Sequence, residues 1–233
     1  MVERMKITIL TIAPEMFCGL QTNHVIDRAV RSGQLEIEIK DIRSYADGCF
    51  RKVDDTPYGG GAGLILRCQP VIDALKDALN HTQGDISCGG GTISAVFAPF
   101  GERYTQETAR RYSHCSHLIL ICGHYEGMDA RIYPYADEVI SVGDYILSGG
   151  ETAAYTVLDS VARLLLGTVK AESLREETFE DGLVEYPQYT RPAEYDGKKV
   201  PDVLLSGNHE AIREWKREQA LLMTRKYRPD LLE

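Results

Sequence analysis

A cluster of carboxylates late in the chain is the first feature that suggests chemistry. Residues 173–182 read SLREETFEDG, and the stretch from Lys170 to Glu185 holds six acids against two bases. A carboxylate within hydrogen-bond reach of a substrate proton acts as a general base, whereas an acidic run without such a target is a solvated connector. Composition by itself favours the connector, and both interpretations stay open at this point. The acids are Glu172, Glu176, Glu177, Glu180, Asp181 and Glu185.

Four glycine-rich loops form a second candidate site. They are residues 57–63 (PYGGGAG), 98–103 (APFGER), 122–131 (CGHYEGMDAR) and 141–151 (SVGDYILSGGE). Glycine lets backbone N–H and C=O groups come close to a ligand, and one such loop by itself is usually an ordinary turn. Three loops in succession after predicted strands favour a ligand pocket, because ligands of open α/β sheets bind at the carboxyl ends of strands. Tyr125 and Tyr145 would flank an apolar or aromatic ligand there.

Several familiar binding motifs are missing from the sequence. No Gly-x-Gly-x-x-Gly follows the first predicted strand, and no Gly-x-x-x-x-Gly-Lys-Ser/Thr occurs, so the usual dinucleotide fingerprint and the P-loop are both absent. The six cysteines include no Cys-x-x-Cys pair and no zinc-type histidine spacing, which predicts reduced thiols and no structural metal. A nucleotide-like cofactor would need a different loop geometry.

Charge is sorted along the chain. The net charge of -9 argues by itself against a nucleic-acid partner, since phosphates are neutralised by Lys and Arg. Residues 207–228, however, hold six bases against three acids and follow the acidic stretch later in the chain. This local excess predicts an RNA-facing segment, with a solvated helix face as the alternative.

The elements that must position these residues follow from hydrophobic periodicity. Strands are predicted over 5–12, 35–42, 93–98, 117–122 and 136–142, and helices over 14–31, 70–80, 105–113 and 151–166. Strands that alternate with helices predict an α/β domain with a mostly parallel sheet. After residue 166 the pattern becomes polar, and a small helical unit follows in which Ile212, Trp215 and Leu222 are expected to share a buried stripe. With no apolar run of membrane-span length and no leader-like start, we expect a cytoplasmic protein.

Seven stretches of the sequence resemble one known family, the bacterial tRNA (guanine-N1)-methyltransferases of the trefoil-knotted (SPOUT) superfamily. The stretches are PEMF, DDTPYGGGAG, CGHYEGMDAR, SVGDYILSGGE, DSVAR, PQYTRP and LLSGNHEAIREWK, which occur in the family's order over nearly the whole chain. The resemblance implies a trefoil-knotted α/β domain with a mostly parallel sheet over residues 1–167, a flexible linker over 168–190 and a small helical tRNA-binding domain over 191–233. It also implies a homodimer with active sites between subunits. The expected reaction is methyl transfer from S-adenosylmethionine to N1 of guanosine 37, in the anticodon stem-loop of tRNA.

The same resemblance assigns site residues position by position. Glu177 would be the general base that removes the N1 proton, and Arg163 would stabilise the charge that develops on the guanine O6. The family also suggests magnesium dependence, although no metal-binding cluster is recognisable in this sequence; neither DNA nor a membrane is an expected partner. The cofactor-binding residues would be Pro99, Gly101, Gly123, Tyr125, Glu126, Gly127, Val142, Gly143, Asp144, Tyr145, Ile146, Leu147, Gly149 and Gly150. The tRNA-binding residues would be Tyr58, Gly59, Asn208, His209, Arg213, Lys216 and Arg217.

The sequence departs from the family pattern at the base. The family typically has Asp where this chain has Glu177, and Glu is one methylene longer, so the carboxylate must be placed differently. Glu176 and Glu180 are alternative bases, and a non-catalytic or differently targeted knotted RNA-binding protein is the alternative function. Two further departures are His124, where Arg is frequent, and the Ala-Gly pair at 62–63, where Pro-Gly is common.

Overall fold

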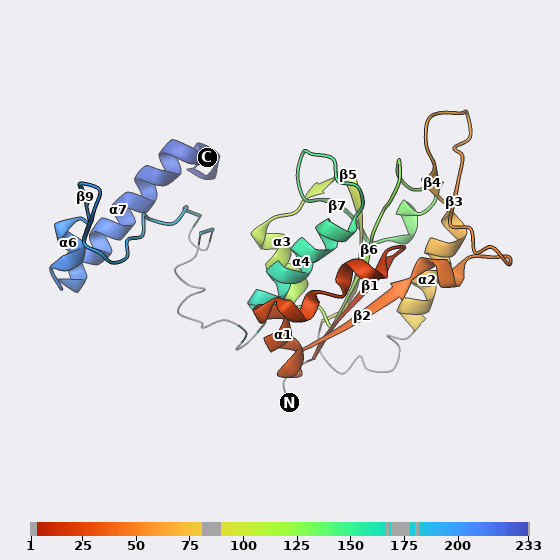
Figure 1. Ribbon diagram of the computed structural model, residues 1–233, viewed down its shortest axis with the longest axis horizontal. Helices are drawn as coiled ribbons and strands as arrows, with labels where there is room; N and C mark the ends of the chain where they lie inside the picture. Colours follow the sequence, from red (N-terminus) through yellow and green to blue (C-terminus); the bar gives the residue numbers. More distant parts are fainter. Residues whose placement is uncertain (1–3, 81–89, 166–167, 169–177, 180–181, 233) are drawn as a thin grey trace. The chain divides into compact units, whose positions relative to one another are not determined.

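The computed structural model describes residues 4–80, 90–165, 168, 178–179 and 182–232. The chain divides into two compact units, Met1–Val169 and Lys170–Glu233. We refer to them as the sheet unit and the helical unit, and each is described by itself. Figure 1 shows the elements of both units in sequence colours.

The sheet unit is built on five parallel strands. They are β1 (Met5–Thr11), β2 (Leu35–Asp41), β5 (Thr92–Arg103), β6 (His117–Ile121) and β7 (Glu138–Ser141), in the spatial order β2-β1-β6-β5-β7. Because all five strands run in one direction, their carboxyl ends gather at one edge of the sheet. The predicted α/β class with a mostly parallel sheet is confirmed, while a trefoil knot in the chain path stays a prediction.

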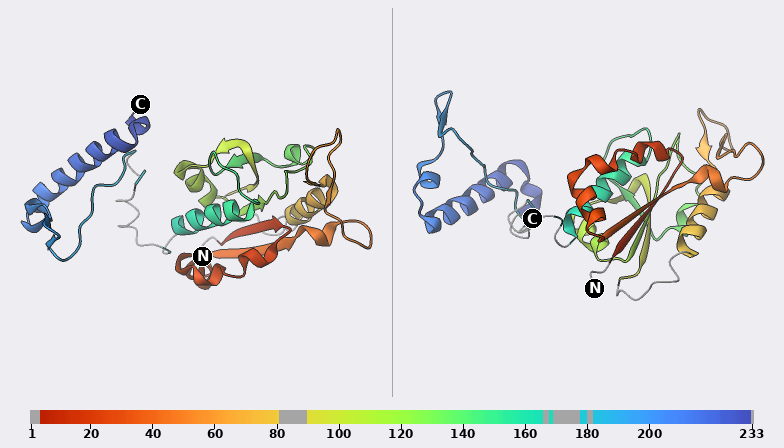
Figure 2. Two further views of the ribbon diagram at one scale, coloured as in Figure 1. Left: turned by 45° about the horizontal axis from the view of Figure 1, so that its top comes forward. Right: turned by 60° about the horizontal axis from the view of Figure 1, so that its bottom comes forward.

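Helices cover both faces of this sheet. On one face lie α1 (His24–Arg31), α3 (Gln106–Ser113) and α4 (Glu151–Leu164), and α2 (Cys68–Asn80) lies on the other, as the views in Figures 1 and 2 agree. Alternate strand residues feed two separate cores, since Ile7, Ile9 and Leu120 pack with α1, α3 and α4, whereas Leu10 and Ile121 pack with α2. A strand buried on both faces reads as a continuous apolar run, which is why HLILI was recognisable as β6.

Two elements of the sheet unit differ from the sequence-based prediction. The helix expected over 14–31 is interrupted: short 3-10 turns at Pro14–Phe17 and Leu20–Thr22 precede α1. The interruption occurs because the Asn23 side chain accepts from the N–H groups of Val25 and Ile26 and so starts a new helix. Strand β5 runs to Arg103 instead of residue 98, with a bulge between Phe97 and Glu102 in its pairing with β7.

The glycine-rich stretch 54–66 forms a small ribbon beside the sheet. Strands β3 (Asp54–Asp55) and β4 (Ile65–Leu66) pair antiparallel, with residues 56–64 between them. A 3-10 turn at Ile42–Tyr45 leads toward the ribbon, and another at Tyr133–Tyr135 precedes β7.

The helical unit centres on α7 (His209–Tyr227), with α6 (Asp202–Leu205) before it and a 3-10 turn (Pro229–Leu232) after it. It also holds a hairpin, β8 (Glu194–Tyr195) and β9 (Lys198–Lys199), turning at Asp196 and Gly197, which both have positive φ. Asp-Gly is a known hairpin signal that the sequence prediction missed. No helix in the described parts of either unit is long and apolar enough to cross a membrane.

The stripe predicted on α7 is only partly buried, with Ile212 and Trp215 half-buried. Leu222 is 49% exposed, so its placement in a buried stripe is wrong, and the buried positions are Ala220 and Thr224. Residues four apart share a helix face, whereas position 222 lies on the other side from both. The N–H of Val184 donates to the Thr224 hydroxyl at 2.9 Å, so part of the predicted linker packs against this helix.

Candidate functional site

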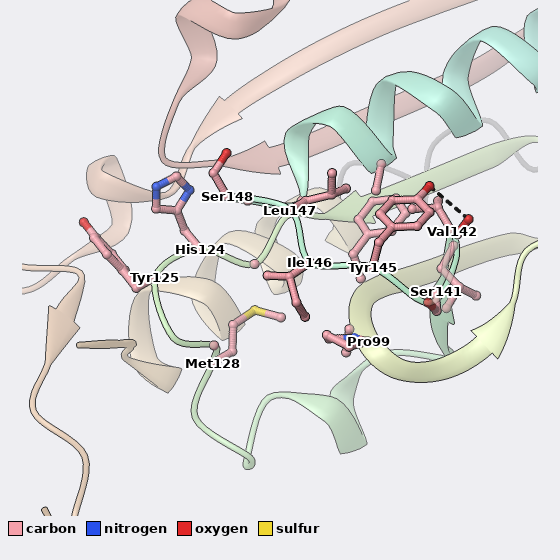
Figure 3. Close-up of a pocket in the computed structure, with 18 of the residues that line it drawn as sticks. Pro99, His124, Tyr125, Met128, Ser141, Val142, Tyr145, Ile146, Leu147 and Ser148 are labelled. Carbon is pink, nitrogen blue, oxygen red and sulfur yellow. Dashed lines mark hydrogen bonds between the residues drawn. The ribbon is translucent and has the colours of Figure 1, made fainter. Parts of the chain in front are cut away.

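A cavity opens at the carboxyl edge of the sheet, among the loops that follow β5, β6 and β7. Its volume is about 360 Å³, within the usual range of small-molecule pockets. Figure 3 shows Pro99, Met128, Ile146, Leu147 and Tyr145 around it. The lining residues are Phe97, Ala98, Pro99, Gly123, His124, Tyr125, Glu126, Gly127, Met128, Tyr133, Ile140, Ser141, Val142, Gly143, Tyr145, Ile146, Leu147, Ser148, Gly149, Gly150 and Ala153.

The loop after β6 is held by the glycine-rich ribbon. The N–H of Leu66 donates to the Gly127 carbonyl at 2.9 Å, and the N–H of Asp129 donates to the Leu66 carbonyl at the same distance. Gly63 has φ of +82°, and a Cβ there would lie 2.4 Å from Cγ of Glu126. Residues 57–63, predicted as one of four ligand loops, therefore support the cavity from outside and do not line it.

The loop after β7 makes a tight turn that exposes apolar side chains. The N–H of Tyr145 donates to the Gly143 carbonyl at 3.0 Å, and the Tyr145 hydroxyl donates to the Val142 carbonyl at 3.2 Å, drawn as the dashed line in Figure 3. The turn leaves Tyr145 58% and Ile146 83% exposed. Exposed large apolar groups at the wall of a pocket are what a bound ligand would cover.

Close backbone contact joins the start of α4 to the end of β6. The N–H of Gly150 donates to the Gly123 carbonyl at 2.7 Å, and a Cβ on Gly150 would lie 2.7 Å from the Cα of Cys122. No side chain fits there without moving backbone, so glycine is required by the packing of the site itself.

One buried carboxylate lies behind the cavity wall. Glu151 is 2% exposed, and its Oε1 accepts from the Thr11 hydroxyl at 2.7 Å. Its Oε2 lies 3.6 Å from Nδ1 of His124. Burial, reinforced by the nearby Glu151 charge, holds the pKa of the Cys122 thiol well above its usual value, so this cysteine is a neutral packing group.

Twelve of the fourteen predicted cofactor residues line the cavity, and Gly101 and Asp144 do not. Gly101 packs over β7, where a Cβ would lie 2.6 Å from backbone atoms of Ile140, and Asp144 points into solvent with its carboxylate 3.0 Å from Arg103 Nη2. The lining residues that the prediction missed mostly neighbour the predicted ones in the same loops, which is the signal that would have found them. They are Phe97, Ala98, His124, Met128, Tyr133, Ile140, Ser141, Ser148 and Ala153.

Arg163, one of the two predicted catalytic residues, does not line this cavity. Arg163 lies in the last turn of α4, thirteen residues beyond Gly150, which corresponds to about 20 Å along the helix. An arginine side chain is much shorter than this distance. Glu177 lies outside the described residues, as do the alternative bases Glu176 and Glu180.

The predicted tRNA-binding residues lie in both units. In the sheet unit, the side chain of Tyr58 is fully exposed on the ribbon beside Gly59. In the helical unit, His209, Arg213 and Arg217 are exposed on α7. The Oδ1 of Asn208 accepts from the N–H groups of Glu210 and Ala211, so this side chain caps α7. Lys216 differs from its basic neighbours because its Nζ lies 4.5 Å from the centre of the Tyr186 ring.

No group of three or more His, Cys, Asp or Glu side chains is placed to hold a metal ion in the part of the chain that the structure describes. Five cysteines fall in this part, and all are free thiols, whereas Cys88 lies outside it.

Comparison with known proteins connects this geometry to a reaction. The profile of the family described as "tRNA (Guanine-1)-methyltransferase TrmD" matches residues 5–233. A tRNA (guanine-N(1)-)-methyltransferase of Clostridium perfringens is 47% identical over 230 residues, covering 98% of this chain and 94% of that protein. Proteins of the same name from Geobacillus kaustophilus (47% over 232 residues; 98% and 92% covered) and Clostridium acetobutylicum (44% over 234 residues; 100% and 93% covered) match similarly.

Proposed function

The chain belongs to the tRNA (guanine-1)-methyltransferase family, and we propose that it transfers a methyl group from S-adenosylmethionine to N1 of guanosine 37 in tRNA. The observation that carries this proposal is the cavity, because three of the predicted ligand loops, two of them family-like motifs, converge on it and twelve predicted cofactor residues line it.

The cavity has the character that S-adenosylmethionine requires. Ile146, Leu147, Pro99 and Met128 offer apolar surface for the adenine ring, and the glycine-rich backbone of residues 142–150 offers polar groups for its edge. When bound, the cofactor supplies a sulfonium methyl group, which is already a strong electrophile. The protein therefore has to activate the guanine and align it.

Activation of guanine requires removal of the N1 proton. We assign this step to Glu177, with Glu176 and Glu180 as alternatives, because a carboxylate of this segment can serve as general base, an effect of roughly 10²–10⁴-fold. The guanidinium of Arg163 would stabilise the negative charge that develops on O6.

The position of Arg163 supports a site shared between two copies of the chain. The backbone of Arg163 lies about 15 Å along α4 from Ala153, the last residue of this helix that lines the cavity, and this distance exceeds the length of an arginine side chain. In a homodimer, Arg163 and the acidic segment of one copy would complete the cavity of the other. The basic residues Arg213 and Arg217 on α7, with Tyr58 of the ribbon, would then position tRNA by contacts to phosphate and base.

Single-turnover methyl transfer to a tRNA transcript tests the base. Glu177→Gln keeps the size but cannot accept the proton, so we expect a rate loss of at least about 100-fold with unchanged cofactor binding, and Glu177→Asp should keep most of the rate. Glu194→Gln, in the β8–β9 hairpin, is the matched control. A native rate in Glu177→Gln would move the base to Glu176 or Glu180.

Mixed dimers test the shared site. One copy carries Arg163→Ala and the other carries Ile146→Asp, chosen to block the cofactor cavity and checked by calorimetry. If Arg163 acts across the dimer, a mixed dimer contains one intact site and recovers up to half of the native rate. If Arg163 serves its own chain, every mixed dimer is inactive, and the shared-site proposal is wrong.

A further inference from the structure

Three segments of the sheet unit meet at the buried Glu151 carboxylate. Glu151 is the first residue of α4, and the hydroxyl of Thr11, at the end of β1, donates a hydrogen bond to its Oε1 at 2.7 Å. The Thr11 oxygen in turn accepts from the N–H of Ala13 at 2.8 Å, which fixes the hydroxyl. The third segment is the loop after β6, which brings Nδ1 of His124 to 3.6 Å from Oε2.

The His124 nitrogen at this contact has no other partner. Nδ1 is buried, and it is the one buried side-chain nitrogen or oxygen in the described residues that lacks a hydrogen bond. Its distance from Oε2 is slightly longer than a hydrogen bond allows. Two lone pairs facing each other in a buried setting would repel, so chemistry requires one proton between Nδ1 and Oε2. If that proton is on Nδ1, a neutral imidazole carries no hydrogen on Nε2.

We propose that His124 is a positioning residue of the cavity: its Nδ1–H closes the 3.6 Å gap to Oε2 and donates a hydrogen bond to Glu151. The bond ties the loop after β6 to the start of α4, and both segments contribute to the cavity wall. This inference rests on the proposed function, because the ligand whose binding would depend on the bond is the cofactor.

The geometry around the contact agrees with this role. His124 pairs with Gly149 in an isolated backbone bridge, and a Cβ on Gly149 would lie 2.3 Å from Oε2 and 2.6 Å from Nδ1. The missing side chain of Gly149 therefore gives the carboxylate and the imidazole room to meet. The imidazole also packs edge-on against the Tyr125 ring, with 4.9 Å between centres, and Figure 3 shows it between Tyr125 and Ser148. A fixed imidazole thus holds Tyr125 at the rim.

Two substitutions of His124, to Asn and to Gln, distinguish the roles of its two ring nitrogens. The amide nitrogen of Asn occupies the place of Nδ1, whereas that of Gln reaches the place of Nε2. We expect His124→Ala and His124→Gln to weaken S-adenosylmethionine binding about tenfold, the effect of one hydrogen bond to a charged group, and His124→Asn to stay within about threefold of native. Calorimetry on the full chain measures this, with His114→Asn on the exposed end of α3 as matched control. The double variant His124→Ala, Glu151→Gln should bind no more weakly than the poorer single variant.

Contrary results would be clear. If Asn binds as weakly as Ala, or Gln as tightly as native, Nε2 is the working atom and the proposal is overturned. Native affinity in all variants overturns it as well.

Nitrogen NMR of the full chain labelled at histidine gives a readout that needs no ligand. The His124 signal is assigned as the one that is missing in His124→Asn. The expected form carries hydrogen on Nδ1. Hydrogen on Nε2 alone overturns the proposal. If the native chain fails to bind the cofactor, the proposed function fails, and this NMR result alone decides the hydrogen bond.

Discussion

The sheet unit and the helical unit are stabilised in different ways. Buried hydrophobic side chains fill both faces of the five-stranded sheet, whereas in the described part of residues 170–233 Ala220 is the only one. Large apolar side chains of the helical unit stay exposed, among them Tyr195 at 77% and Leu205 at 61%. The densely packed unit therefore shapes the cavity, while the other unit mainly presents basic side chains on a helix.

Truncation of one leucine in each unit gives the largest expected contrast. Leu120, in the central strand β6, is fully buried, and Leu120→Ala should lower the free energy of unfolding by about 3 kcal/mol through lost burial and a new cavity. Leu222→Ala should cost less than about 0.5 kcal/mol, as exposed positions do. Urea unfolding of the full chain measures both. A large loss of stability in Leu222→Ala would contradict this difference between the units, because it would mean that a second copy of the chain covers that face of α7.

Acid should weaken the sheet unit through His117. Burial, with further contributions from Lys6 and Lys40 that outweigh the opposing charge of Glu38, lowers the pKa of this imidazole from 6.5 to about 4. Below pH 6.5 the unfolded chain binds a proton at His117, whereas the folded chain does not bind it until about pH 4. The contribution of His117 to the free energy of unfolding is therefore complete above pH 6.5 and is lost as the pH falls from 6.5 to about 4. The loss approaches about 3 kcal/mol at the acid end.

Unfolding measured from pH 7 to pH 4 tests this assignment. His117→Gln should flatten the slope, and His114→Gln, at an exposed site, should leave it as in the native chain. An unchanged slope in His117→Gln would assign the acid sensitivity to other groups.

Affinity for tRNA and affinity for the cofactor should respond to substitutions in different units, and the losses of tRNA affinity are the smallest effects expected. Arg213→Ala and Arg217→Ala should each weaken tRNA binding by roughly three- to tenfold and reduce the slope of log affinity against log salt by about one, with cofactor affinity unchanged. Lys216→Ala should do less, since this ammonium already contacts Tyr186. Ile146→Asp should show the reverse pattern, with cofactor binding lost and the salt slope kept. If the arginine variants leave the slope unchanged, α7 does not contact phosphate.

Much of the sheet unit was predictable because its signals are local. Apolar runs and helical spacing depend only on neighbouring residues, so β1, β2, β6, α2 and α3 were found within a few residues. The distance of Arg163 from the cavity was also predictable from the sequence. A helix that starts at Glu151 places Arg163 more than three turns from its first residue. The break before α1 was missed because it depends on one capping side chain, and the β8–β9 hairpin because its strands are two residues long.

The alternation of strands and helices, the motif loops and the family were predictable from residue types and short spacings. Which loops meet depends on the tertiary structure. The order β2-β1-β6-β5-β7 places β6 between β1 and β5, so the loop after β6 reaches both the end of β1 and the start of α4. Because of this order, Gly149 both lines the cavity and leaves the space in which His124 and Glu151 approach each other. Gly101 instead packs against Ile140 of β7, outside the cavity. Strand order arises from packing between distant segments, and no local spacing encodes it.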